Sequence, residues 1–132
     1  MLNSIHHIAI IVSDYTKSKH FYTEILGLKI IAEHFREDRS SFKLDLSVND
    51  TSQIELFSFP SPPPRLSHPE ATGLRHLAFS VDNLEEVLNH LKNFNITTEP
   101  IRIDEFTGKR FTFFSDPDGL PIELYEVKGI ST

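Results

Sequence analysis

A chain of 132 residues is long enough for one domain with a real hydrophobic core and too short for two independent domains. Its hydrophobic share of 39% and its 11 phenylalanines are typical of a globular protein, and the absence of cysteine excludes disulfides and thiolate metal ligands. A net charge of −6 argues against binding to nucleic acid or to anionic membranes. Without an apolar run of about 18 residues or a leader-like start, the sequence predicts a soluble, cytoplasmic domain.

One strand-like pattern that contains a histidine occurs twice. Residues 5–12 (Ile-His-His-Ile-Ala-Ile-Ile-Val) return as residues 74–81 (Leu-Arg-His-Leu-Ala-Phe-Ser-Val), which aligns His7 with His76. The neighbouring His6 aligns with an arginine, so the repeat singles out His7. A lone histidine in a strand is more often structural than functional. The repetition is what makes these two histidines candidates for a site.

A second repeated pattern contains a glutamate. Residues 53–57 (Gln-Ile-Glu-Leu-Phe) return as residues 121–125 (Pro-Ile-Glu-Leu-Tyr), which aligns Glu55 with Glu123. Each glutamate stands between two large aliphatic residues, and an unpaired buried carboxylate costs several kcal/mol. We therefore expect a cation to neutralise each glutamate. A metal ion would do so and would account for both histidines, whereas structural ion pairing is the alternative.

The first half of the chain predicts a β-α-β-β-β unit, with strands over residues 5–12, 28–35, 40–48 and 53–59. Residues 5–12 are apolar on both faces, which predicts a strand buried on two sides. Period-two alternation places one set of side chains on the face of His7, namely Ile5, His7, Ala9 and Ile11. Ser13 or Asp14 is expected to cap the helix that follows, and Gly27 to end it after Leu26.

Residues 60–73 hold five of the eight prolines, which excludes a helix or a central strand there. We expect an extended connector, or a flap over the site, although residues 60–65 also match a polyproline recognition motif.

The second half repeats the plan, with strands over residues 74–81, 97–103, 110–115 and 121–127. The sequence Asp82-Asn83-Leu84-Glu85 resembles a capping box, and Asn83 aligns with Asp14. The helix core stripe consists of Leu84, Val87, Leu88 and Leu91, and the helix is expected to end near Asn93. Residues 116–119 (Asp-Pro-Asp-Gly) predict a tight turn. The predicted organisation is one domain over residues 1–132, with modules at 4–59 and 74–128 joined by the connector 60–73.

Four ligands that offer two nitrogens and two carboxylate oxygens suit Zn, Ni, Co, Mn or Fe(II). Such a set leaves positions for water or substrate oxygens, which favours catalysis over a closed structural site. The other histidines (His20, His34, His68 and His90) are expected to be solvated or structural. The cations Arg102, Lys109 and Arg110 either bind an anionic part of a substrate or form a solvated basic face.

These motifs resemble the vicinal-oxygen-chelate superfamily, the group of glyoxalase I, fosfomycin-resistance thiol transferases, methylmalonyl-CoA epimerase and extradiol dioxygenases. The resemblance covers essentially the whole chain, from the sequence around His7 to that around Glu123. It implies an α+β fold of two paired βαβββ modules whose curled mixed sheets surround a divalent metal ion. It also implies that the metal ligands are His7, Glu55, His76 and Glu123.

Within the superfamily the chain looks most like small lactoylglutathione-lyase-like proteins, which implies a metal-dependent lyase or isomerase. The resemblance implies that the metal holds two adjacent oxygens of a small substrate and stabilises an ene-diolate. Glu123 is then expected to act as the base, with Glu55 delivering the proton on the opposite face.

Two positions depart from glyoxalase I, which typically carries an Arg and an Asn there that help to hold glutathione. This chain has Ile11 and Phe59 instead, which argues against glutathione hemithioacetal as the substrate. The alternatives are an extradiol-type dioxygenase, which needs two His and one carboxylate on Fe(II), and a non-catalytic drug-binding module. A homodimer is expected, and the sequence leaves open whether one chain or two complete the site.

Overall fold

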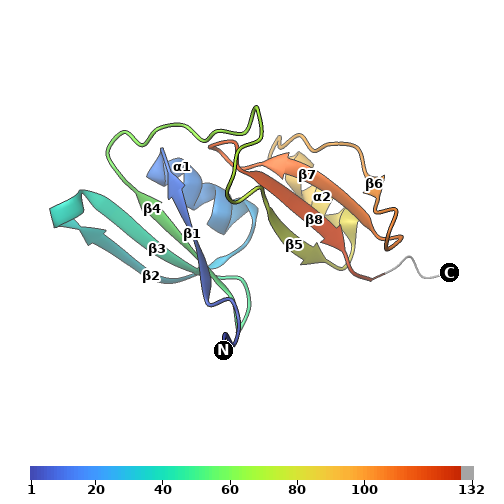
Figure 1. Ribbon diagram of the computed structural model, residues 1–132, viewed down its shortest axis with the longest axis horizontal. Coiled ribbons are helices and arrows are strands. Elements are labelled where there is room, and N and C mark those ends of the chain that lie inside the picture. The colour runs from blue at the N-terminus through green and yellow to red at the C-terminus, as the bar shows by residue number, and fades with distance from the viewer. Residues whose placement is uncertain (129–132) are drawn as a thin grey trace. The chain divides into compact units, whose positions relative to one another are not determined.

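The computed structural model describes residues 1–128 and divides into two compact units, Met1–Pro64 and a second unit that begins at Arg65 (Figure 1). Each unit has the element order β-α-β-β-β and contains one four-stranded mixed sheet. The duplicated βαβββ fold predicted from the sequence is thereby confirmed.

In the first unit the strand order is β1-β4-β3-β2, with β1 parallel to β4 and the other neighbours antiparallel. The strands are β1 (His7–Val12), β2 (Lys29–Arg36), β3 (Ser41–Ser47) and β4 (Gln53–Ser58). A short 3-10 turn, Glu37–Arg39, connects β2 to β3. Because β1 and β4 are parallel neighbours, side chains from the first and last strands of the unit lie side by side on one face of the sheet.

The helix of the first unit begins and ends where the sequence predicts. Asp14 caps α1 (Tyr15–His20) by accepting a hydrogen bond from the backbone N–H of Lys17 at 3.1 Å. A short π-helix, Phe21–Ile25, continues α1. Gly27 follows with a φ of 77°, a left-handed conformation that costs glycine little.

The second unit has the strand order β5-β8-β7-β6, again with the first and last strands parallel. Its elements are β5 (Leu77–Val81), α2 (Leu84–Asn93), β6 (Arg102–Ile103), β7 (Arg110–Ser115) and β8 (Pro121–Glu126). Asn83 caps α2 by accepting from the N–H of Glu86 at 3.2 Å, so the aligned residues Asp14 and Asn83 play the same role. The tight turn at 116–119 also forms, since the N–H of Gly119 donates to the carbonyl of Asp116 at 3.1 Å.

Two predictions for the strands are wrong. The strand predicted over residues 97–103 is reduced to Arg102–Ile103. Pro100 explains this, because it has no N–H to donate to a ladder and restricts the residue before it. The first strand is buried on one face, not two: Ile10 and Val12 are buried, whereas Ile11 is 57% exposed on the face of His7.

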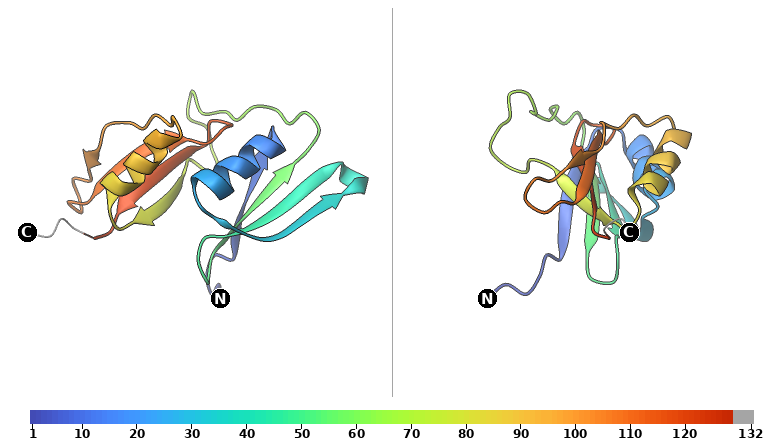
Figure 2. Two further views of the ribbon diagram at one scale, coloured as in Figure 1. Left: turned by 180° about the vertical axis from the view of Figure 1, so that it is seen from behind. Right: turned by 90° about the vertical axis from the view of Figure 1, so that its right-hand side faces the viewer.

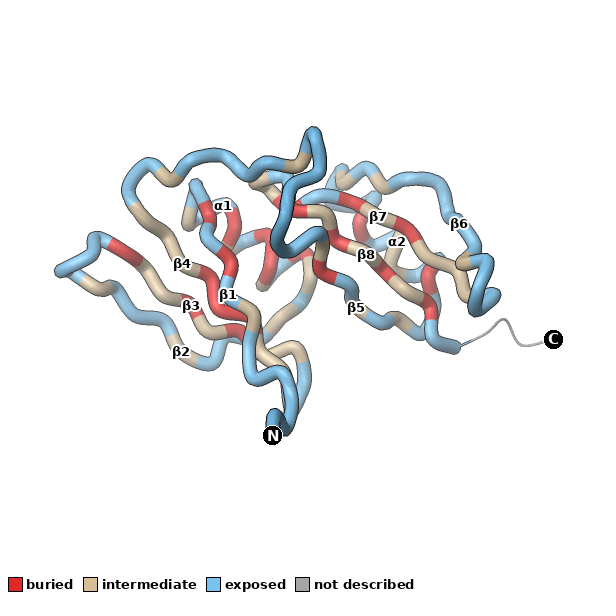
Figure 3. The backbone as a smooth tube through the Cα atoms, in the orientation of Figure 1, coloured by how far each residue is buried: buried red, intermediate tan, exposed pale blue. Residues whose placement is uncertain are grey.

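Each helix lies over one face of its own sheet (Figure 2), and the hydrophobic core of each unit lies between them. Figure 3 shows the buried residues concentrated along the strands and the inner sides of the helices. The core of the first unit includes Tyr22, Leu44, Leu46 and Leu56, and that of the second includes Leu84, Leu91, Ile122 and Leu124. In the described part of the chain, none of the helices has the length and apolarity needed to cross a bilayer. The face of each sheet away from its helix carries the candidate site residues.

Candidate metal centre

In the first unit, strand register brings His7 beside Glu55. Ala9 is the partner of Glu55 in the parallel β1–β4 pair, so His7 lies two positions earlier on the same face. Nδ1 of His7 is 3.4 Å from Oε2 of Glu55. The carboxylate side chain is only 10% exposed, whereas the imidazole is 41% exposed. The unit therefore presents a half-exposed imidazole beside one sheltered carboxylate, and Nδ1 of His7 also lies 3.0 Å from Nδ1 of His6.

Two charged residues of β3 complete the surroundings of Glu55. Asp45 lies directly opposite Glu55 in the antiparallel β3–β4 pair, and two like charges in that position repel each other. The ammonium of Lys43 relieves this repulsion, at 2.7 Å from Oδ1 of Asp45 and 3.5 Å from Oε1 of Glu55. The hydrogen bond to Asp45 holds the pKa of Lys43 above its usual value, so the ammonium stays charged. Nothing in the residue patterns predicts this role of Lys43, because the contact depends on how β3 pairs with β4.

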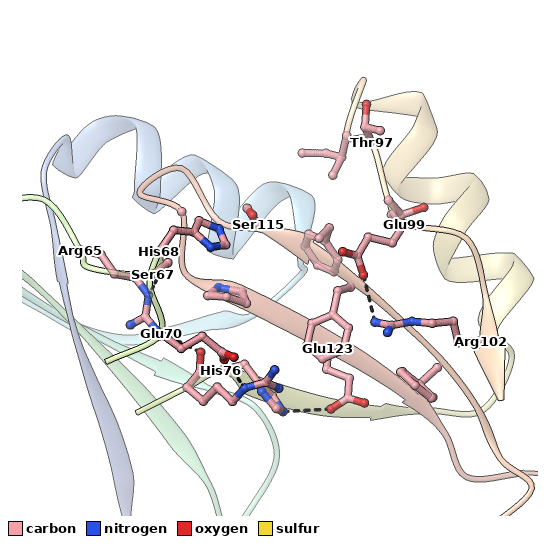
Figure 4. Close-up of a pocket in the computed structure, with 18 of the residues that line it drawn as sticks. Arg65, Ser67, His68, Glu70, His76, Thr97, Glu99, Arg102, Ser115 and Glu123 are labelled. Carbon is pink, nitrogen blue, oxygen red and sulfur yellow. Dashed lines mark hydrogen bonds and ion pairs between the residues drawn. The ribbon is translucent and has the colours of Figure 1, made fainter. Parts of the chain in front are cut away.

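In the second unit, His76 and Glu123 form the equivalent pair. Glu123 is the partner of Ala78 in the parallel β5–β8 pair, and Nε2 of His76 lies 3.1 Å from Oε1 of Glu123. Here the residue opposite the glutamate is Phe113, whose ring packs edge-on against the imidazole with the ring centroids 5.1 Å apart. The pair lines a hollow of about 1000 Å³, shown in Figure 4.

The geometry of this second pair fits two neighbouring ligands of one ion. Metal–nitrogen and metal–oxygen bonds of about 2.1 Å at a right angle place the two donor atoms about 3 Å apart. The 3.1 Å separation in the structure is close to that value. Nδ1 of His76 is buried and makes no hydrogen bond within the described residues. Because a buried nitrogen is out of reach of an ion in the hollow, Nε2 is the nitrogen that can bind a metal ion. Within the described part of either unit, no third His, Asp or Glu joins the pair to form a metal-holding group.

The three cations that the sequence places near the last strands do not form one cluster. Arg102 lies over the rings of Phe111 and Phe113, 5.0 and 5.6 Å from their centroids, and pairs with Glu99. Lys109 donates to the carbonyl of Val127. Of these three cations, only Arg102 lines the hollow together with His76 and Glu123.

Arg110 takes part in a structural network. Its guanidinium binds both oxygens of Glu126, at 2.8 and 2.9 Å, and also pairs with Glu85. Glu126, which is only 4% exposed, also accepts the N–H of Leu84 at the start of α2. Arg110 and this N–H hold the pKa of Glu126 below its usual range, and Arg110 lowers the pKa of Glu85 to about 2. The network joins the helix to the sheet.

Residues 4–124 match the Glyoxalase/Bleomycin resistance protein/Dioxygenase superfamily. The chain belongs to this superfamily. It is 62% identical to the uncharacterized protein YwkD of Bacillus subtilis over 126 residues, which cover 96% of this chain and 98% of that protein. It is 30% identical to the metallothiol transferase FosB of Staphylococcus saprophyticus over 95% of this chain and 78% of that protein. The family resemblance drawn from the motifs is therefore confirmed.

A solved structure supports the same fold. The glyoxalase family protein from Enterococcus faecalis matches with a TM-score of 0.87 at 50% identity, over 93% of this chain and 97% of that one. Members of the superfamily include glyoxalases, thiol transferases and dioxygenases, so membership leaves the reaction of this chain open.

Proposed function

We propose that the chain is a metal-dependent lyase or isomerase of the glyoxalase type that acts on a small α-oxygenated substrate. The proposed ligands of one divalent ion, drawn from Zn, Ni, Co, Mn and Fe, are His7, Glu55, His76 and Glu123. The observation that carries the proposal is the duplicated His–Glu pair, on the same face of the same kind of sheet in both units. Two unrelated structural ion pairs would have no reason to repeat in register.

In this proposal the two glutamates move the proton. A bound divalent ion would hold two adjacent substrate oxygens and lower the pKa of the neighbouring C–H group. Glu123, bordered by the ring of Phe113, is proposed as the base that removes the carbon-bound proton. Glu55 is proposed to return a proton on the opposite face of the substrate. The side chain of Glu123 is only 13% exposed, and limited contact with water favours proton transfer to carbon.

The positions that hold glutathione in glyoxalase I carry apolar side chains here. Ile11 lies on the face of His7, and Phe59 stacks on Phe57 with the ring centroids 6.4 Å apart. Neither side chain offers a hydrogen bond to a peptide-like ligand. We therefore propose a substrate other than glutathione hemithioacetal.

The test begins with metal analysis of the purified protein, followed by assays of metal-loaded protein with methylglyoxal in the presence and absence of glutathione. The proposal predicts a bound divalent ion and, for a small α-oxygenated substrate, exchange of the carbon-bound proton with solvent deuterium. Protein that binds no divalent ion would overturn the proposal and favour a non-catalytic binding module. Protein that binds the ion and turns over the glutathione adduct would overturn the substrate assignment alone.

One observation favours a second candidate function, extradiol-type oxygen chemistry. Lys43 already pairs with Glu55, which leaves two histidines and the single carboxylate of Glu123. Two histidines and one carboxylate on Fe(II) are the ligand set of many non-haem oxygenases. Full metal affinity in a Glu55→Ala variant, together with oxygen consumption in the presence of a catechol, would select this function over the first.

We also propose a homodimer, as is common in this superfamily, with its mass to be measured by sedimentation. Exposed apolar side chains on the face of His7 in the first unit, such as Ile11, support a partner at this face.

A further inference from the structure

Three arginines line the hollow of the second unit, and one of them, Arg65, has no carboxylate partner among the described residues. Arg75 pairs with Glu70, and Arg102 pairs with Glu99. Arg65 also lines the hollow, but none of the ion pairs among the described residues includes it. Figure 4 shows Arg65 on the connector side of the hollow, with Glu123 drawn between it and Arg102. Its positive charge is the one that no carboxylate of the hollow neutralises.

Neutral acceptors hold the guanidinium of Arg65 in place. Nε donates to Oγ of Ser67 at 2.9 Å, and Nη2 donates to the carbonyls of Leu74 and Arg75 at 2.9 and 3.0 Å. An arginine side chain loses conformational entropy when its guanidinium is fixed, and here that loss precedes the binding of any ligand. The N–H groups of Nη1 make no hydrogen bond within the described residues. The result is a fixed cation with a free pair of donors.

The same contacts connect Arg65 to the candidate metal ligands. The carbonyls that hold it belong to the two residues immediately before His76, and Nε2 of His76 lies 3.1 Å from Glu123. The hollow therefore places a fixed guanidinium and the His–Glu pair on one continuous surface. Its three arginines and three glutamates balance in charge, so a divalent ion bound at the pair would leave the hollow positive.

We propose that Arg65 binds an anionic group, a carboxylate or a phosphate, of the substrate whose adjacent oxygens would bind the ion held by His76 and Glu123. This inference rests on the proposed function and narrows it to an anionic, α-oxygenated substrate class. Hydrogen bonds from a charged guanidinium to a carboxylate or phosphate are stronger than neutral ones, and a group held in place in advance loses less entropy on binding. The N–H groups of Nη1 are the ones available to the anion. The connector thus has a role in substrate binding besides joining the two units.

The test measures anion binding to metal-free protein by NMR titration, following backbone N–H signals of residues that line the hollow, such as Ser67 and His76, which the wild type and every variant share. The probes are inorganic phosphate, acetate, and uncharged hydroxyacetone as the neutral comparison. We expect at least one anion to bind the wild type. Arg65→Met should weaken the binding of that anion about 10-fold or more, because the variant loses one charge-assisted interaction. Arg102→Met, which removes an already paired cation from the same hollow, should weaken it less than about 3-fold. Arg65→Lys should retain part of the affinity, since the charge remains.

Binding of both anions to Arg65→Met with wild-type affinity would overturn the inference, as would the absence of anion binding to the wild type. The phosphate and acetate arms distinguish the two sources of the anionic group. Metal affinity, measured separately by calorimetry, separates this test from that of the proposed function. Arg65→Met should bind the divalent ion as the wild type does. Failure of the wild type to bind any ion would count against the metal site and not against Arg65.

Discussion

The two units carry the same His–Glu pair in different electrostatic surroundings. The residue opposite Glu55 is Asp45, whereas the residue opposite Glu123 is Phe113. One glutamate therefore shares an ammonium with a second carboxylate, and the other is bordered by an aromatic ring. Duplication thus preserved the His and Glu residues while the neighbouring strand diverged, so the two carboxylates differ in their freedom to bind a cation.

The faces of the two sheets that pack against the helices differ as well. In the first unit Tyr15 of α1 stacks on Phe42 of β3, with the ring centroids 4.2 Å apart, and its hydroxyl donates to Glu33. In the second unit the ion-pair network of Arg110 and Glu126 holds the start of α2. The first unit therefore adds an aromatic stack to an ion pair between Lys19 of α1 and Glu33 of β2, whereas in the second unit the network centres on the buried carboxylate of Glu126.

The largest expected effect is the loss of a metal ligand. Glu123→Gln should weaken binding of a divalent ion by more than about 100-fold, beyond the 10–100-fold typical of residues that only support a ligand. Glu55→Gln should weaken it less, because Lys43 already competes for the Glu55 carboxylate. Calorimetric titration with Zn and Mn measures both. Equal losses in the two variants would show that the different surroundings have no effect on metal binding.

The next effect concerns the charged network of the second unit. Arg110→Met leaves the carboxylate of Glu126 sheltered without its cation, and we expect the melting temperature to fall by about 10 °C. Arg102→Met is the matched control, since its ion pair with Glu99 is exposed and should change the melting temperature by less than about 2 °C. Similar melting temperatures for the two variants, measured by circular dichroism, would contradict a stabilising role for the network.

The same network should make the stability of the fold, measured as its melting temperature, depend on pH. The folded-state pKa values of Glu126 and Glu85 lie below those of the unfolded chain, so their contribution is present above about pH 4.5. It is lost as pH falls through the folded-state values, with Glu85 at about 2. The difference in melting temperature between wild type and Glu126→Gln should therefore shrink between pH 5 and pH 2. A constant difference across that range would contradict the ion-pair explanation.

The smallest expected effect is a gain in affinity for a divalent ion. Lys43→Met removes a positive charge from beside Glu55 and should raise affinity for a divalent ion by about 2- to 10-fold. Lys43→Arg keeps the charge and should stay close to the wild type. Weaker metal binding in Lys43→Met than in Lys43→Arg would show that Lys43 supports Glu55 as a ligand instead of competing for it.

Features fixed by a short stretch of sequence were predictable from it. The repeat aligned Asp14 with Asn83, and both cap their helices. The turn at 116–119 formed because its residue types determine it locally. Alternation along β1 placed His7 and Ile11 on one face, and the structure agrees.

Features that depend on strand register or on the path of a loop were not predictable. Lys43 meets Glu55 only because β3 pairs with β4 in one register, which residue patterns in a single strand do not determine. Arg65 finds its acceptors because the connector turns back on itself before β5. The strand over residues 97–103 was overpredicted because its β-branched residues outweighed Pro100.

The most direct test of the central claim is the metal stoichiometry of wild type, His7→Ala and His76→Ala, measured by elemental analysis after dialysis. If both His–Glu pairs bind the same ion, the wild type holds one ion per chain and each variant loses nearly all of it. This holds whether one chain or two supply the ligands. Two ions per wild-type chain, with one retained in each variant, would contradict the shared site.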